Sequence, residues 1–165
     1  KVSKNAYIYI KYDDNTTQDD DGETNSTDNF AIIPSKYIFG IKSKIKAGET
    51  YNIEINATDN DGVALTDYNQ TLDNSSDRNS TLIFIHKNGD REDNGTIKFE
   101  FGDGVAKRDD FNISDIGNYR LELNDTNFAQ IDKDDTAEEN RTIYGSFDIK
   151  VVPYKFKVEL KTDKT

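Results

Sequence analysis

The stretch YNIEINAT, residues 51–58, alternates apolar and polar side chains without interruption. Successive side chains of a β-strand point to opposite faces of the sheet, so every second residue shares a face. The alternation therefore predicts a strand with one face in a core and the other in solvent. The same period of two recurs in residues 97–101, 119–124 and 147–151. Together these runs predict an all-β chain.

Two further segments, 6–12 and 81–86, are more continuously apolar, which is typical of strands buried on both faces or at an interface. Asp-Gly and Asn-Gly pairs, which favour tight hairpin turns, fall between the runs, and no amphipathic helix is evident. We therefore expect an antiparallel β-sandwich. Its predicted core is Tyr51, Ile53, Ile55, Ile97, Phe99, Phe101, Tyr119, Leu121 and Leu123.

The composition narrows the functional classes. The 165 residues carry a net charge of −11, which disfavours binding to nucleic acid phosphates and to anionic membranes. Without cysteine the chain has neither disulfides nor thiolate metal sites. No stretch approaches the roughly 20 apolar residues of a membrane-spanning helix, so we expect no membrane insertion.

Residues 115–119, Asp-Ile-Gly-Asn-Tyr, precede the alternating strand at 119–124. This resembles the Asp-x-Gly-x-Tyr-x-Cys signature of immunoglobulin-type domains, with Leu121 in place of the cysteine. In that family the tyrosine forms a corner, its hydroxyl reaching back to upstream backbone. The resemblance implies an Ig-like sandwich.

Residues 32–41 are similar in sequence to residues 151–160, and the only two prolines, Pro34 and Pro153, align. A repeat of this length suits one sandwich domain, although chance similarity between two strands is the alternative. A genuine repeat would place one domain at 34–152. Residues 1–33 would then end a preceding unit or supply an N-terminal pairing strand. Residues 153–165 would start a next repeat or supply a C-terminal pairing strand.

The order of short motifs from Tyr51 to Phe156 is similar to tandem Ig-like modules of bacterial surface and adhesin proteins. The stretches 101–106, 116–119, 145–147 and 152–156 resemble a domain of mannose-sensitive haemagglutinin pilus-biogenesis proteins. The resemblance implies a surface or pilus-associated role.

Asn-x-Ser/Thr, the acceptor triplet of N-glycosylation, occurs ten times, whereas random order would give about 2.5. An Asp or Glu stands two residues before the asparagine, position −2, in nine of the ten; only Asn74, preceded by Leu72, lacks it. Polar loops rich in Asn, Asp and Thr would explain some triplets but not the fixed offset of the acid.

The extended motif Asp/Glu-x-Asn-x-Ser/Thr resembles the acceptor site of bacterial-type oligosaccharyltransferases. The resemblance implies glycosylation by such an enzyme during export, with Asn74 doubtful. The expected acceptors are Asn15, Asn25, Asn56, Asn69, Asn79, Asn94, Asn112, Asn124 and Asn140.

Acidic clusters could supply oxygen ligands to Ca²⁺, although solvated acidic loops are the commoner explanation of such clusters. The candidates are Asp19, Asp21, Asp59, Asp61, Asp132 and Asp134. No cofactor is required. A lone histidine and the absence of any nucleophile motif predict that the chain is not an enzyme.

We therefore expect a structural module of an exported, densely N-glycosylated bacterial surface protein: an adhesin stalk, a pilus-associated protein or a filament subunit. Export would run through the periplasm to the cell surface or medium. The terminal strands would pair with copies of the same chain or with neighbouring repeats. The alternative is a Ca²⁺-dependent module that binds a carbohydrate or a receptor.

Overall fold

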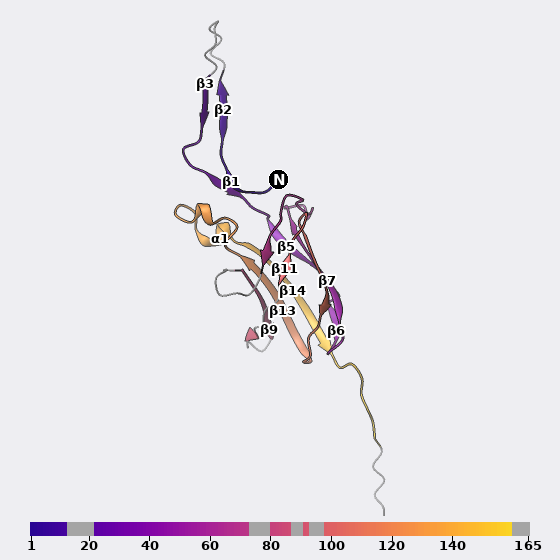
Figure 1. Ribbon diagram of the computed structural model, residues 1–165. Helices are drawn as coiled ribbons and strands as arrows, with labels where there is room; N and C mark the ends of the chain where they lie inside the picture. Colours follow the sequence, from indigo (N-terminus) through magenta and orange to yellow (C-terminus); the bar gives the residue numbers. More distant parts are fainter. Residues whose placement is uncertain (13–21, 73–79, 87–90, 93–97, 160–165) are drawn as a thin grey trace, which may run out of the picture.

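Two β-sheets face each other in the computed structural model, which describes residues 1–12, 22–72, 80–86, 91–92 and 98–159 (Figure 1). The larger sheet has five strands in the order β10-β9-β13-β14-β6, and the smaller has three in the order β12-β7-β5. The chain is thus an antiparallel β-sandwich, as the alternating runs predict. Its sheets comprise β5 (Lys36–Gly40), β6 (Lys44–Lys46), β7 (Tyr51–Thr58), β9 (Ser80–His86), β10 (Arg91–Glu92), β12 (Val105–Phe111), β13 (Gly117–Asp125) and β14 (Ile143–Val152).

The central strands are the ones with the clearest alternation. In the smaller sheet, β7 pairs antiparallel with both β5 and β12. In the larger sheet, β13 pairs antiparallel with β9 and β14 along most of its length. Among the strands that the structure describes, the one parallel pairing joins β14 to β6, with Val151 opposite Ile45. A separate short pair joins β8 (Thr71–Leu72) antiparallel to β11 (Phe99–Glu100).

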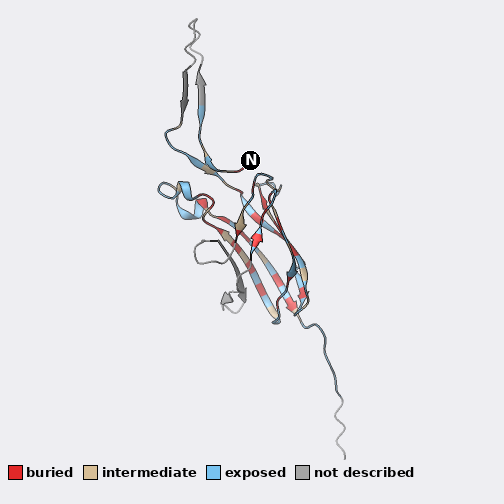
Figure 2. Cartoon of the chain, in the orientation of Figure 1, coloured by how far each residue is buried: buried red, intermediate tan, exposed pale blue. Residues whose placement is uncertain are grey.

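The core lies between the sheets, where alternate residues of β7, β13 and β14 are buried (Figure 2). Seven of the nine predicted core residues are buried, and Leu121 and Ile55 are completely enclosed. Tyr51 is an exception, because it lies at the rim half-buried, where its hydroxyl accepts a hydrogen bond from the Lys46 amide. Ile97 lies outside the described residues.

The two sheets approach closely where Gly145 of β14 lies against Tyr37 of β5. A Cβ on Gly145 would lie 2.5 Å from both the Cβ and the carbonyl oxygen of Tyr37. Real side chains do not tolerate that distance, so only glycine lets the two backbones come together here.

Two local predictions from the sequence are confirmed. The Tyr119 hydroxyl donates to the carbonyl oxygen of Asp115 at 3.3 Å, as the tyrosine-corner motif predicts. The Asp103-Gly104 pair makes a two-residue hairpin turn between Gly102 and Val105, with φ of 52° and 79° at the two turn residues. Positive φ at both positions is what a type I′ turn requires.

Helical structure is minor in the described residues: η1 (Gln130–Asp132) and the one-turn α1 (Glu138–Arg141), both in the connection between β13 and β14.

The N-terminal segment forms a hairpin that projects from one end of the sandwich (Figure 1). β1 (Ser3–Ala6) pairs with β4 (Phe30–Ile32), and β2 (Tyr9–Tyr12) pairs with β3 (Gly22–Asn25). The hairpin is anchored by the Ala31 amide, which donates to the Asp132 carboxylate at 3.0 and 3.3 Å.

Of the two alternatives for segment 6–12, burial on both faces is wrong for this chain, because Tyr7, Ile8 and Tyr9 are all exposed on the hairpin. Burial at an interface with another chain stays a prediction. At the opposite end, residues 153–159 leave β14 without forming a strand (Figure 1). Phe156 is 85% exposed and Val158 87%.

Candidate functional site

Three of the acceptor asparagines lie outside the main sheets with exposed side chains: Asn69, Asn112 and Asn140. Asn69 accepts a hydrogen bond from the Asp103 amide at 3.0 Å through Oδ1. Asn112 follows the last residue of β12, and its amide contacts the Asp110 carbonyl oxygen at 3.4 Å. Asn140 lies on α1. A glycan on any of the three would extend into solvent.

Two further acceptors, Asn56 and Asn124, lie on the central strands of the two sheets and are half-buried. Their neighbours Ile55 and Leu123 point into the core, so both asparagines lie on the outward faces, as the alternation predicts. Each outer face of the sandwich therefore carries one expected acceptor on its middle strand.

The remaining acceptors are not all placed. Asn25 lies on β3, but its side chain is not described. Asn15, Asn74, Asn79 and Asn94 lie outside the described residues. Leu72, which occupies the −2 position of Asn74, is a core residue with 4% exposure. A carboxylate there would be buried without a partner, which gives a physical reason for the missing acid.

Three of the acids at −2, Glu54, Asp110 and Glu138, form ion pairs in the folded chain, the last with Arg141 at 3.4 Å. Glu54 pairs with Lys107 at 3.0 Å, and Asp110 with Arg108 at 2.6 Å. The hydrogen bond from Lys107, and a weaker one from Asn56, lower the pKa of Glu54. The hydrogen bond from Arg108 lowers the pKa of Asp110 in the same way. Both acids are therefore ionised at neutral pH.

Strand geometry alone accounts for part of the acid offset. Residues i and i+2 of a strand share a face, so Glu54 beside Asn56 and Glu122 beside Asn124 follow from an outward polar face. The same argument fails for Asn69 and Asn140, which lie outside strands. There the offset has no structural cause that we can identify.

Two of the calcium candidates, Asp59 and Asp132, accept backbone hydrogen bonds that stabilise the fold. Asp59 accepts the amides of Asp61 and Val63 at 3.0 and 2.9 Å and so closes its own turn. Asp132 anchors the N-terminal hairpin, and Asp134 lies exposed beside it. Within the described residues no three acidic or histidine side chains are grouped as a metal site would require. Asp19 and Asp21 lie outside that part of the chain.

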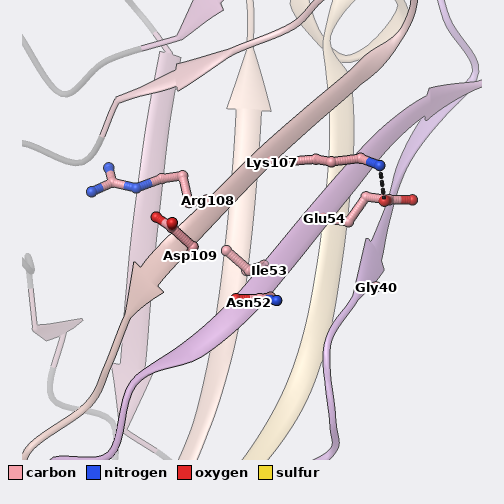
Figure 3. A pocket seen from close by; sticks show the side chains of 7 residues that line it. All are labelled: Gly40, Asn52, Ile53, Glu54, Lys107, Arg108 and Asp109. Atoms are coloured by element: carbon pink, nitrogen blue, oxygen red, sulfur yellow. Dashed lines mark ion pairs between the residues drawn. The ribbon is translucent and has the colours of Figure 1, made fainter.

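A shallow hollow of about 620 Å³ lies on the outward face of the smaller sheet (Figure 3). Its lining is mostly polar and charged, and the Lys107–Glu54 ion pair crosses it. None of its lining residues is aromatic, so it offers no stacking platform for a sugar ring. Those residues are Gly40, Asn52, Ile53, Glu54, Lys107, Arg108 and Asp109.

A buried polar chain, which the sequence does not predict, links the two sheets. The hydroxyls of Tyr37 on β5 and Tyr68 in the loop after β7 lie 2.5 Å apart, and Tyr68 donates to the Asp125 carboxylate at 3.1 Å. The other Asp125 oxygen accepts the amides of Asn127 and Phe128. Burial, followed by the nearby Tyr68 and Asp125, raises the pKa of Tyr37 well above its ordinary value. Burial and Asp125 raise the pKa of Tyr68 as well.

No known protein family matches this chain, and a search of curated proteins found no significant match. In the part of the chain that the structure describes, no helix is long and apolar enough to cross a membrane.

Proposed function

We propose that this chain is a non-enzymatic structural module of an exported, densely N-glycosylated bacterial surface protein. The observation that carries the proposal is the acid at −2 in nine of ten acceptor triplets. Every acceptor whose side chain is described is exposed or half-buried, and none is enclosed. A bulky hydrated glycan needs that placement.

The Ig-like character of the sandwich is part of this proposal. One sheet contains β5, β7 and β12 and the other β9, β13 and β14, which is the division of the first, second and fifth strands from the third, sixth and seventh in immunoglobulin domains. The Tyr119 hydroxyl bond to Asp115 supports the same assignment.

The module would function within a tandem array or filament. In the alignment of residues 32–41 with residues 151–160, Tyr37 and Phe39 of β5 correspond to Phe156 and Val158. The first two are 3% and 7% exposed, whereas the second two are exposed almost completely. The segment after Pro153 thus has the apolar pattern of a first sandwich strand without a sheet to join.

The N-terminal hairpin supports the same arrangement. β4 runs through Pro34 into β5, just as β14 runs into Pro153. Both β1–β4 and β13–β14 are antiparallel pairs that enclose a long, acid-containing connection. The hairpin and residues 153–159 lie at opposite ends of the sandwich (Figure 1), which suits contacts in series along one axis.

Mass spectrometry of the protein from its native host tests the proposal. Sugar should be found on the nine acid-preceded asparagines, and Asn74 should be bare or poorly occupied. A matched substitution, Asp110→Asn, should empty Asn112 while leaving Asn140 occupied. Native protein without sugar at any of these positions would refute the proposal.

A further inference from the structure

Asn56 is flanked on both sides by other strands of its sheet. It lies on β7 with Ile38 of β5 opposite on one flank and Val105 of β12 on the other. Its amide Nδ2 donates to Glu54 Oε1 at 3.2 Å, and its Oδ1 is buried without a hydrogen-bond partner. The nitrogen that would receive a sugar is therefore bonded to the acid at −2.

The third residue of this triplet is also inaccessible to an enzyme in the folded chain. Thr58 is fully buried, and its hydroxyl donates to the Lys36 carbonyl oxygen at 3.3 Å. An enzyme that recognises Asn-x-Ser/Thr must reach that hydroxyl. In the folded chain it is out of reach.

The Asn124 triplet is enclosed in a different way. Asn124 lies on β13 between Thr81 of β9 and Tyr144 of β14. The middle residue, Asp125, is the carboxylate that accepts the buried Tyr68 hydroxyl, and the third, Thr126, is 8% exposed. Drawing this triplet into an enzyme would break the polar chain that links the two sheets.

Asn112 provides the contrast within the same molecule. Both Asn112 and Ser114 are exposed, and the triplet follows the last strand residue of β12. Its acid, Asp110, is also exposed on the surface. The middle residue, Ile113, is 6% exposed and its carbonyl oxygen accepts the Gly48 amide at 2.9 Å, so opening this triplet breaks a loop contact but no strand pairing of either sheet.

We propose that Asn56 and Asn124 accept glycans only before the chain folds, whereas Asn112 remains an acceptor on the folded protein. This inference rests on the glycosylation proposed above. In the transfer, the asparagine Nδ2 bonds to the anomeric carbon of a lipid-linked oligosaccharyl diphosphate. The bond from that carbon to the diphosphate oxygen breaks, the lipid diphosphate leaves with the bonding electrons, and the amide proton passes to a base.

The size of the effect follows from how each triplet opens. A central strand is released only when its sheet comes apart, which amounts to global unfolding. At ordinary domain stabilities fewer than about one chain in 1,000 is open at any time. Transfer to Asn56 and Asn124 should therefore be slower on the folded chain than on an unfolded one by at least about 1,000-fold.

The test compares folded and unfolded acceptors in one assay. The full chain is produced in a host without the transferase, and peptides spanning 52–60, 108–116 and 120–128 serve as unfolded references. A full-length Leu121→Asp variant, which places a charge at a fully buried core position, is a second unfolded acceptor. A bacterial-type oligosaccharyltransferase and its lipid-linked donor are added, and mass spectrometry gives the initial rate at each asparagine.

All three peptides should be modified at similar rates. On the folded chain, Asn112 should stay within about tenfold of its peptide, while Asn56 and Asn124 should slow by about 1,000-fold or more. Modification of folded Asn56 or Asn124 within tenfold of its peptide would overturn the inference and leave the proposed function intact. Equal slowing at Asn112 would also overturn it. Peptides that accept no sugar would refute the proposed glycosylation itself, and the inference with it.

Discussion

Replacing Tyr68 by phenylalanine tests whether the buried polar chain stabilises the sandwich. Asp125, when ionised, can only accept hydrogen bonds, so the single Tyr68 proton must point toward it. Tyr37 must then donate to Tyr68, which makes Tyr68 the centre of the chain. Tyr68→Phe removes both bonds but keeps the aromatic ring, which packs 5.2 Å from the rings of Phe101 and Phe128.

The magnitude follows from the two bonds lost. A hydrogen bond to a charged group contributes about 1.5–3 kcal/mol to stability and a neutral one about 0.5–1.5. Tyr68→Phe leaves one Asp125 oxygen and the Tyr37 hydroxyl buried without their present partner. We expect a loss of about 2–4 kcal/mol in the free energy of unfolding. Tyr37→Phe breaks only the neutral bond and should cost about 1 kcal/mol.

Urea unfolding of the unglycosylated chain measures both losses. The Tyr68→Phe midpoint should fall by roughly 1–2 M with an unchanged slope, and the Tyr37→Phe midpoint by clearly less. Asp125→Asn, which exchanges a charged acceptor for a neutral one, should lie between them. Equal effects of the two tyrosine substitutions, or a larger effect at Tyr37, would contradict the direction of donation.

The raised tyrosine pKa values add a pH dependence with a definite sign. Above about pH 10 the unfolded chain loses phenolic protons that the folded chain retains, so unfolding is favoured as pH rises. The stabilisation is complete below pH 10 and is lost as pH rises toward the folded-state pKa values. Tyr68→Phe should show a shallower fall in stability above pH 10 than the parent chain.

Three other predictions concern single substitutions, and the first has a matched control. Gly145→Ala should lower the melting temperature, because the new Cβ would collide with β5 and such overpacking destabilises a protein by about 1–3 kcal/mol. Gly102→Ala is the control: its Cβ would meet nothing within 4 Å, so the melting temperature should not change. Asp132→Asn should speed hydrogen exchange at the Ala31 amide while leaving the melting temperature of the sandwich unchanged; unchanged exchange would show that this bond does not anchor the hairpin. Phe156→Asp should abolish any self-association in sedimentation velocity without lowering stability, since its side chain is exposed; association that persists would place the contact elsewhere.

The alternating runs predict the fold well because one core face is enough to define a strand. Ile53, Ile55, Leu121 and Leu123 are buried on the side that the period of two assigns to them. The same period places Asn56 and Asn124 on outward faces. The period of two does not predict how many other strands flank a given strand. That number determines how tightly the fold holds Asn56 and Asn124.

Tyr68 shows where local pattern fails. It lies in a loop between polar residues and has no alternating neighbours, yet it is completely buried. Its burial arises from Tyr37, Phe101 and Phe128, which reach it from three separate parts of the chain. The N-terminal hairpin is a similar case. Its apolar run predicts a strand, but the run alone does not predict whether other elements bury that strand.

The parallel pairing of β6 with β14 determines how the sandwich would bear tension. A pull between Pro34, which precedes β5, and Pro153, which follows β14, draws the start of the β5–β6 segment away from the end of β14. Two parallel strands loaded at opposite ends slide past each other, so their hydrogen bonds are strained together rather than opened one by one. The bonds in that position run from the Lys150 amide to Ser43 at 2.8 Å and from the Ala47 amide to Val152 at 2.9 Å. A module used as a stalk would therefore resist extension at this seam, and the seam rather than the core would set the force at which it yields.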